Sequence, residues 1–294
     1  MKSTIKNIIK LMRVKQWYKN LMIFLPLIFA KDLFNINPLL LTVIGFFALS
    51  FMSSANYIIN DIADRKKDRS HPEKKDRPIA AGKIKVWHGI LIAAILIAVS
   101  VYLSLILSLP FLGFNILLFV STLLYSFIFK NEPFLDIIFI AINFVIRTVS
   151  GAFVIASGYS PYIKVSSWLI LCPFFLSIFL SSAKREGDLL FLGKEAEKHR
   201  KVLSIYTKDV TRALMIMSTT LLIITYTLYT FFSEFQGLLL TLPVALYIIF
   251  RYFYLVESGS EISRQTEKIY RDKKIIVAVL LMMSIIFISV YVLK

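Results

Sequence analysis

Long apolar stretches separated by polar connections make up most of the sequence after residue 19. The hydrocarbon core of a bilayer is about 30 Å thick, so a helix needs about 20 apolar residues to cross it. Nine stretches are predicted to be transmembrane helices: 19–36, 38–60, 86–108, 111–129, 134–156, 164–184, 209–232, 236–256 and 274–293. The first is interrupted by Pro26, Lys31 and Asp32. The pattern predicts an all-α integral membrane protein with one transmembrane domain, 1–294, and a polar cap.

Basic residues fall almost entirely on one side of this nine-helix arrangement. With the N-terminus in the cytoplasm, 30 of the 34 Lys and Arg residues lie on the cytoplasmic side. Lys31, Lys164 and Lys294 lie on the other side, and Arg147 lies inside a predicted span. An excess of Lys and Arg is typical of cytoplasmic loops. We therefore expect an inner-membrane protein whose N-terminus and long polar loops face the cytoplasm.

Composition agrees with this prediction and excludes several other classes of protein. Hydrophobic residues make up 57% of the chain, and its mean hydropathy of +0.73 is too high for a soluble core. The net charge of +16 is then explained by cationic loops, so no nucleic-acid partner is expected. A single cysteine, Cys172, excludes an intramolecular disulfide framework and a cysteine-rich metal site.

The most informative polar stretch lies at the cytoplasmic end of the second predicted span. It reads Asn56-Tyr57-Ile58-Ile59-Asn60-Asp61-Ile62-Ala63-Asp64-Arg65-Lys66-Lys67-Asp68. Asn56, Asn60, Asp64 and Asp68 are four residues apart, a spacing that places side chains on one helical face. Asp61 precedes Asp64 by three residues and joins the same face. Oxygen ligands in this pattern suit Mg²⁺, which binds one or two carboxylates together with substrate phosphates. An ordinary solvated helix end is the alternative interpretation.

The loop that follows combines helix-breaking residues with cations. Pro72 and Pro78 interrupt a helix, and Gly82 permits a tight turn before the third span. Lys74 and Arg77 are therefore expected close to the acidic residues. A metal-bound diphosphate needs this mixture, because acids hold the metal and cations hold the remaining phosphate oxygens.

These residues resemble a known family. The motif Asn60-Asp61-x-x-Asp64-x-x-x-Asp68, followed by Arg77-Pro78-Ile79-Ala80-Ala81-Gly82, is similar to that of the UbiA superfamily of intramembrane prenyltransferases. The resemblance implies a nine-helix bundle in which Mg²⁺ binds a diphosphate. It also implies that the metal ligands are Asn60, Asp61, Asp64 and Asp68, with the three aspartates in the catalytic role.

Further motifs resemble the decaprenyl-phosphate phosphoribosyltransferase branch of that superfamily. They are Lys15-Gln16-Trp17-Tyr18-Lys19-Asn20, Ser54 to Asp61, Asp68-Arg69-Ser70-His71-Pro72, Leu124-Tyr125-Ser126 with Lys130, Leu135-Asp136, Lys184-Arg185 and Arg200 to Thr207. Prenyltransferases of the superfamily carry a second aspartate-rich motif after their sixth helix. Here the chain has Ala183-Lys184-Arg185-Glu186-Gly187-Asp188, without a D-x-x-x-D pattern.

The cations at this place favour a bare phosphate over a second metal. Phosphoribosyl diphosphate offers such a group, its 5-phosphate. Simple anchoring of the helix end by Lys184 and Arg185, and a second metal on Glu186 and Asp188, remain open alternatives. Arg147 has two open interpretations as well, a structural interhelical pair or a cavity residue.

The residues and the resemblance together predict a membrane phosphoribosyltransferase that uses Mg²⁺. It would transfer 5-phosphoribose from phosphoribosyl diphosphate to a polyprenyl phosphate, giving a precursor of cell-envelope sugar lipids. The lipid phosphate is already ionised near neutral pH, so no general base is required. The predicted substrate-binding residues are Lys15, Lys19, Asn56, Asn60, Lys74, Arg77, Tyr125, Lys130, Lys184 and Arg185.

Two other functions are weighed against this one. The first is a conventional prenyltransferase that moves an isoprenoid from a diphosphate to an aromatic or glycerol acceptor, which a second D-x-x-x-D motif would have favoured. The second is a transporter of phosphorylated lipids or anions, which has little use for three converging carboxylates. The CDP-alcohol phosphotransferases are excluded because their D-G-x-x-A-R signature is absent from the sequence.

Overall fold

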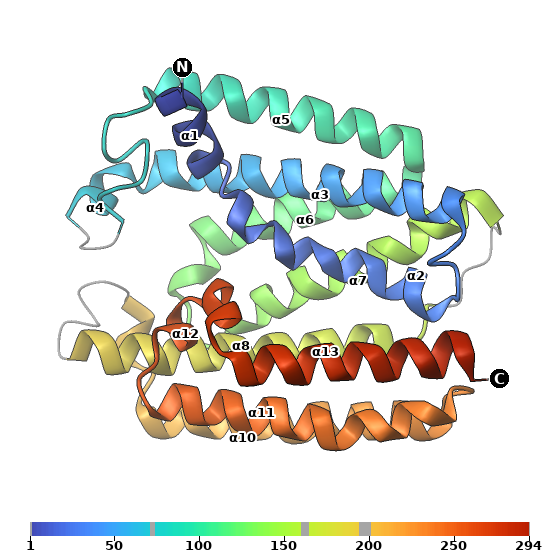
Figure 1. The fold of residues 1–294 in the computed structure, drawn as a ribbon. Coiled ribbons are helices and arrows are strands. Elements are labelled where there is room, and N and C mark those ends of the chain that lie inside the picture. The colour runs from blue at the N-terminus through green and yellow to red at the C-terminus, as the bar shows by residue number, and fades with distance from the viewer. Residues whose placement is uncertain (1, 71–73, 160–164, 194–200, 294) are drawn as a thin grey trace. The chain divides into compact units, whose positions relative to one another are not determined.

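The computed structural model describes residues 2–70, 74–159, 165–193 and 201–293, and every regular element in these ranges is a helix (Figure 1). His71 and Pro72 of the sequence motifs, and Arg200, lie outside the described residues. The chain divides into two compact units. One comprises Met1–Ile128 and Ile146–Val165, and the other Phe129–Val145 and Ser166–Lys294, so the boundary falls inside α7 (Leu135–Tyr159).

Eight helices within the described ranges are long and apolar enough to cross a membrane. They are Ile36–Ala63, Val86–Leu107, Leu109–Phe127, Leu135–Ile155, Trp168–Leu192, Lys208–Phe232, Gln236–Glu257 and Lys273–Val292. The predicted count of nine is not confirmed, because the first predicted span, 19–36, is not one long helix. It consists of a 3₁₀ segment followed by a short helix. The chain then turns at Lys31, whose φ of 61° is incompatible with a right-handed α-helix.

The first unit is built around α3. Its elements are α1 (Lys2–Leu11), η1 (Val14–Phe24), α2 (Leu25–Phe29), α3 (Ile36–Ala63), α4 (Arg65–Arg69), α5 (Val86–Leu107) and α6 (Leu109–Phe127), with the second part of α7. α3 packs side by side with α5. The hydroxyl of Ser100 donates to the carbonyl of Ala48 at 2.7 Å, and the amide of Asn115 on α6 donates to Ser100 at 2.8 Å. Buried hydrogen bonds thus connect three apolar helices.

A close backbone approach fixes η1 against α7. Gly151 faces the backbone of Ile23, and a Cβ atom on Gly151 would lie 2.1 Å from the carbonyl oxygen of Ile23. Gly45 on α3 faces the side chain of the same isoleucine, at 2.9 Å from its ideal Cβ position. The irregular η1 segment is therefore held between two regular helices by residues that lack a side chain.

The second unit contains the remaining helices. They are η2 (Phe129–Asn131), the first part of α7, α8 (Trp168–Leu192), η4 (Lys201–Ser204), α10 (Lys208–Phe232), η5 (Gln236–Leu240), α11 (Thr241–Glu257), α12 (Glu261–Arg264), η6 (Thr266–Arg271), α13 (Lys273–Phe287) and the π-helical turn η7 (Ile288–Val292). α8 pairs with α10 and α11 pairs with α13 (Figure 1). A core that includes Phe179, Met215, Ile249, Tyr252 and Ile275 joins them.

A charged residue begins the last long helix of this unit. Oδ1 of Asp272 accepts from the amide of Ile275 at 2.9 Å, which caps α13. Its Oδ2 accepts from Nη2 of Arg251 on α11 at 2.8 Å. The guanidinium holds the pKa of Asp272 below its usual range, so the cap stays ionised at neutral pH.

Gly151→Ala is expected to destabilise the protein because its methyl group cannot fit beside the carbonyl of Ile23. Overpacking of this kind costs about 1–3 kcal/mol. The matched control is Gly113→Ala on α6, where an added Cβ meets nothing within 4 Å. Thermal unfolding in detergent should show a lower midpoint for the first variant alone. Equal midpoints for the two variants would contradict the close approach.

The orientation predicted from the loop cations can be tested by labelling single cysteines in a Cys172→Ser background. Lys66→Cys and Tyr270→Cys, at exposed positions after α3 and before α13, should react with an impermeant thiol reagent only from the cytoplasmic side. Glu234→Cys, between α10 and η5, should react only from the outside and serves as the control. The reverse pattern would invert the orientation, and a mixed pattern would break the span assignment.

Candidate functional site

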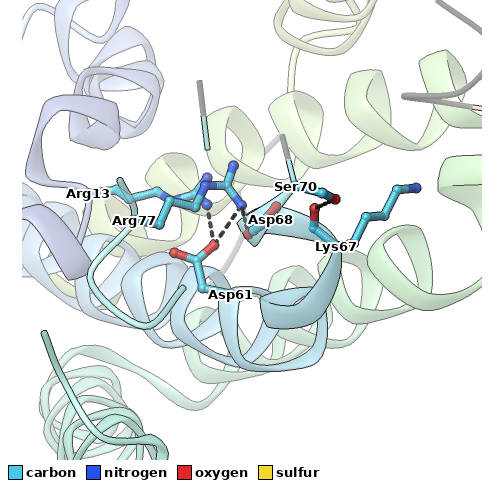
Figure 2. Close-up of polar contacts among 6 residues, drawn as sticks. All are labelled: Arg13, Asp61, Lys67, Asp68, Ser70 and Arg77. Carbon is cyan, nitrogen blue, oxygen red and sulfur yellow. Dashed lines mark hydrogen bonds and ion pairs between the residues drawn. The ribbon is translucent and has the colours of Figure 1, made fainter. Parts of the chain in front are cut away.

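Two acidic side chains meet at the end of α3, where Arg77 bridges them (Figure 2). Its Nη1 atom donates to Oδ1 of Asp61 at 3.0 Å and to Oδ2 of Asp68 at 2.8 Å. Arg13 donates a further hydrogen bond to Oδ1 of Asp61. Both aspartates are buried, with 2% and 3% of their surface exposed. We name Arg13, Asp61, Asp68 and Arg77 the carboxylate–arginine cluster.

A helix break brings Asp68 to this cluster. Asp64 has φ −85° and ψ 2°, so α3 ends at Ala63 and α4 begins at Arg65. The amide of Asp68 donates to the carbonyl of Asp64 at 2.9 Å. Asn56, Asn60 and Asp61 lie on α3 and Asp64 is its C-cap, whereas Asp68 belongs to α4, so the predicted continuous helix is interrupted between Asp64 and Asp68. Asp68 reaches Asp61 from a separate short helix, because the chain turns after Ala63.

The loop that carries Arg77 is fastened to the same region. The amide of Ala81 donates to the carbonyl of Arg77 at 2.8 Å, and Nε of Arg69 donates to the carbonyl of Ala80 at 3.1 Å. Gly82 follows with a φ of 70°, a conformation that glycine adopts without steric cost. The predicted turn at Gly82 is thus confirmed, and Arg77 lies close to the acidic residues as expected.

Arg13 enters the cluster from the link between α1 and η1. Its backbone is left-handed, with φ 51° and ψ 46°, which is unfavourable for a residue with a Cβ atom. Its guanidinium carbon lies 4.9 Å from the ring centroid of Tyr57, a cation–π distance. The ion pair with buried Asp61 and this ring contact compensate for the backbone strain. The sequence interpretation missed Arg13, which it counted only as one of several N-terminal cations.

The donor chemistry of the cluster fits Mg²⁺. One nitrogen of Arg77 lies within 3.0 Å of both carboxylates, so a single point between them can reach Asp61 and Asp68. Mg²⁺ binds in this way through one or two carboxylates and leaves its other positions to water and phosphate. Across the described part of the chain, no group of three acidic, His or Cys side chains converges on one point. The ligand set with Asp64 and Asn60, both half-buried, stays a prediction.

Asn56 supplies a further polar group on the same helix. It is 2% exposed, and among the described residues neither its amide nitrogen nor its amide oxygen has a hydrogen-bond partner. A buried polar group without a partner costs about 1–3 kcal/mol. Proteins retain such groups mostly where a ligand, an ion or water can meet them. Asn56 therefore supports the predicted polar cavity beside the acidic residues.

The other predicted phosphate-binding residues of the first unit lie at different depths. Lys15 is exposed, Lys19 lies 5.9 Å from the ring centroid of Tyr18, and Lys74 is half-buried just before Arg77 in sequence. Tyr125 is half-buried near the end of α6. Lys130, in η2 of the second unit, is also half-buried. Their contacts with phosphate stay predictions.

A second buried ion pair occupies the second unit. Nη2 and Nε of Arg185 on α8 each lie 2.9 Å from Oδ2 of Asp136 on α7. The hydroxyl of Tyr206 donates to Oδ1 of Asp136 at 2.6 Å and accepts from the amide of Phe134 at 2.9 Å. Arg185 is 1% exposed and Asp136 is fully buried. Burial beside Asp136 raises the pKa of Tyr206, so this phenol keeps its proton and remains a donor.

The second polar motif is therefore divided between two environments. Lys184 is exposed, while its neighbour Arg185 points into the unit and is paired with Asp136. Glu186 is buried and accepts from the hydroxyl of Thr211 at 3.2 Å. Asp188 is half-buried, with its Oδ2 3.9 Å from Nη1 of Arg185. The binding of a 5-phosphate by Lys184 and Arg185 together stays a prediction, and only Lys184 is solvent-accessible.

Comparison with solved structures shows where this fold occurs. A UbiA homolog from Archaeoglobus fulgidus bound to GPP and Mg²⁺ matches with a TM-score of 0.73 over 97% of this chain and all of that one, at 19% identity. A digeranylgeranylglyceryl phosphate synthase matches with a TM-score of 0.68 over 98% of this chain and 99% of that one, also at 19% identity. At this identity the likeness establishes the fold.

Sequence comparison gives relatives of known name. The decaprenyl-phosphate phosphoribosyltransferase of Corynebacterium glutamicum is 33% identical over 237 residues, which cover 78% of this chain and 69% of the relative. The enzyme of that name from Mycolicibacterium smegmatis is 29% identical over 82% of this chain and 75% of the relative. The model of the UbiA prenyltransferase family matches residues 21–269. This integral membrane protein belongs to the UbiA prenyltransferase family.

Proposed function

We propose that the protein transfers 5-phosphoribose from phosphoribosyl diphosphate to a polyprenyl phosphate. The observation that carries the proposal is the motif on α8. Where a prenyl-diphosphate enzyme is expected to have a second acidic motif, this chain presents the exposed cation Lys184 and pairs its neighbour Arg185 internally. The names of the relatives from Corynebacterium glutamicum and Mycolicibacterium smegmatis support the same substrates.

The carboxylate–arginine cluster suits a diphosphate leaving group. Mg²⁺ held by Asp61 and Asp68 would neutralise the charge that builds on the departing diphosphate. Arg13 and Arg77 are 24% and 22% exposed and can turn from the carboxylates to phosphate oxygens. Charge-assisted hydrogen bonds from a guanidinium to phosphate are among the strongest that proteins form. The four residues thus provide carboxylates for the metal and guanidinium groups for the phosphate oxygens of phosphoribosyl diphosphate.

The transfer is a substitution at the anomeric carbon of ribose. An oxygen of the lipid phosphate forms the new bond to this carbon while the bond to diphosphate breaks, and the electron pair leaves with diphosphate. A phosphate monoester carries about −1.5 to −2 charges near neutral pH, so the nucleophile needs no base. The task of the protein is then to position two anions and to stabilise the leaving group. We place this reaction at the cytoplasmic side of the inner membrane, where most loop cations lie.

Conventional prenyl transfer is the alternative that the fold comparison keeps open, since a solved relative is bound to GPP and Mg²⁺. An assay of the purified protein distinguishes the two. Radiolabelled phosphoribosyl diphosphate with a polyprenyl phosphate should give a labelled lipid. Prenyl diphosphates with aromatic acceptors should give no product. The opposite result would replace our proposal by the prenyltransferase function.

Asp61→Asn and Asp68→Asn should each lower kcat by about 10²–10³, the loss typical of one electrostatic contact to a developing charge. Both should also weaken the binding of Mn²⁺, used as a spectroscopic probe for Mg²⁺, and excess EDTA should abolish turnover of the wild type. Asp76→Asn is the matched control, because Asp76 is an exposed acid in the same loop. Full activity in EDTA, or unchanged Mn²⁺ binding in both cluster variants, would contradict the metal assignment.

Lys184 and Arg185 offer a matched pair of neighbouring cations with opposite expected effects. Lys184→Ala should weaken the binding of phosphoribosyl diphosphate by about tenfold to a hundredfold and leave the unfolding midpoint unchanged. Arg185→Ala should destabilise the protein by about 3–5 kcal/mol, because it leaves Asp136 buried without its partner. Donor titrations and thermal unfolding of both variants test this. If Lys184→Ala binds phosphoribosyl diphosphate as tightly as the wild type, the motif on α8 no longer supports phosphoribosyl diphosphate as the substrate.

A further inference from the structure

The first helix of the chain, α1, lies across the end of a membrane-spanning helix. It contacts α3 and crosses it near the end that carries the carboxylate–arginine cluster (Figure 1). α3 has 28 residues, so it is about 42 Å long and exceeds the hydrocarbon core of about 30 Å. The polar side chains of Asn60 and Asp61 mark the end that extends beyond this core. α1 therefore lies at the surface of the bilayer.

One side of α1 packs against the protein, and the adjoining side is exposed. Leu11 is fully buried in a core with Ile58 of α3, and Ile8 is half-buried. Ile5 and Ile9, one turn apart, are 55% and 50% exposed. At about 100° per residue, Ile5 lies about 60° from Ile8 and about 40° from Ile9 around the helix axis. The apolar stripe thus continues from the packed side onto the exposed side.

Cations border the exposed part of this stripe. Lys6 and Lys10 are exposed and lie about 60° and about 100° from Ile9 around the helix axis. The sequence of α1 contains no acidic residue, so the charge of the helix is entirely positive. A helix with these two features buries its apolar face about 5–10 Å into a bilayer surface and places its cations on anionic headgroups. The apolar surface and the charge of α1 both match an anionic lipid surface.

α1 is also fastened to the loop that carries Arg77. Nζ of Lys10 donates to the carbonyl oxygen of Asp76 at 2.7 Å, directly before Arg77 in sequence. Leu11 shares its core with Ile79, which follows Arg77 by two residues. A shift of α1 would therefore be transmitted to this loop on both sides of Arg77.

The residues that follow α1 carry Arg13 into the cluster. Only Met12 separates Leu11, the last residue of α1, from Arg13, which is paired with Asp61. The hydroxyl of Ser54 on α3 donates to the carbonyl oxygen of Met12 at 2.8 Å. A link of one residue is too short to absorb a shift of the helix. The position of α1 thus sets the position of Arg13.

We propose that α1 binds the anionic lipid surface beside the end of α3 and thereby holds Arg13 and the loop of Arg77 in the geometry that receives the diphosphate. The part that concerns diphosphate rests on the proposed function, and the lipid-binding part does not. A lipid surface fits better than a second copy of this chain, because a symmetric contact through α1 would bring identical lysines together. The protein then works at full rate only in a membrane that contains anionic lipid.

A fluorescent label on the exposed apolar side measures membrane contact directly. In a Cys172→Ser background, Ile5→Cys is labelled with NBD, and the full-length protein is reconstituted in vesicles. In equal parts of phosphatidylcholine and phosphatidylglycerol, the emission should shift to the blue and be quenched by spin-labelled lipid. In phosphatidylcholine alone, the quenching should be weaker. Lys66→Cys, at an exposed position of α4, carries the same label as the control and should stay in water.

Two variants separate the charge of α1 from its apolar surface. Lys6→Gln should weaken the preference of the label for phosphatidylglycerol by about fivefold, the effect of one cation near an anionic surface. Lys67→Gln is the matched control, because Lys67 is exposed and its side chain points away from the cluster (Figure 2). Ile9→Ser should abolish the insertion of the label. Its unfolding midpoint should stay close to that of the wild type, because Ile9 is 50% exposed.

The link to the cluster is measured in the same vesicles. Amide hydrogen exchange of segment 76–82 should be slower in the mixed vesicles than in phosphatidylcholine, and Ile9→Ser should lose this difference. The KM for phosphoribosyl diphosphate should rise by about tenfold in the same variant, because the guanidinium contacts to phosphate are no longer held in place.

The outcomes distinguish this inference from the proposed function. A label at position 5 that stays in water, or that inserts equally well without anionic lipid, would overturn the lipid assignment. A blue shift without quenching by spin-labelled lipid would show a protein contact and overturn it as well. Equal exchange of segment 76–82 in both kinds of vesicle would overturn the link to the cluster. Insertion and slowed exchange in a wild type that makes no phosphoribosyl lipid would uphold the binding of α1 and its link to the cluster, and overturn the proposed function alone.

Discussion

A charge removed from water must be met by another group inside the protein, and this requirement shapes both units. In the first unit Arg77 holds two buried carboxylates, and in the second Arg185 holds one. Removing such charges from water without a partner would cost more than most other single interactions contribute. The two arrangements differ in how closed they are. Arg77 is 22% exposed, whereas the pair of Arg185 with Asp136 is sealed and further fixed by Tyr206. A partly open pair can exchange partners with a ligand, and a sealed pair supports the surrounding helices.

Regular periodicity was sufficient to predict much of this architecture. The apolar stretches after residue 36 each correspond to a long helix, because no other backbone conformation satisfies its hydrogen bonds within a hydrocarbon core. The spacing of Asn56 and Asn60 predicted a helix here, and both lie on α3, with Asp64 at its C-cap. These predictions rest on local repeats, which the sequence displays directly. Membership of the UbiA prenyltransferase family likewise followed from residues close together in the chain.

Contacts between distant segments were beyond such reasoning. Arg13 meets Asp61 across 48 residues, and its left-handed backbone has no signal in the neighbouring sequence. The separation of Lys184 from Arg185 depends on where α8 faces its neighbours, so two adjacent cations looked equivalent until the helix was placed. The first predicted span is a 3₁₀ segment and a short helix rather than one long helix, and η1 is held by a close approach to Gly151 that the sequence does not display. In each case tertiary contacts decided the outcome.

The composition of the carboxylate–arginine cluster has a thermodynamic consequence. Two carboxylates and two guanidinium groups sum to zero, so the cluster is electrically balanced by itself. A divalent cation that binds alone would be repelled by the two guanidinium groups, and an anion that binds alone would be repelled by the two carboxylates. When the cation and the anion bind together, the cation pairs with the carboxylates and the anion pairs with the guanidinium groups that those carboxylates release. In the proposed function, the affinity for either ion would therefore be coupled to the presence of the other, and this linkage would be reciprocal. The cluster would bind the metal together with the diphosphate more tightly than either ion alone.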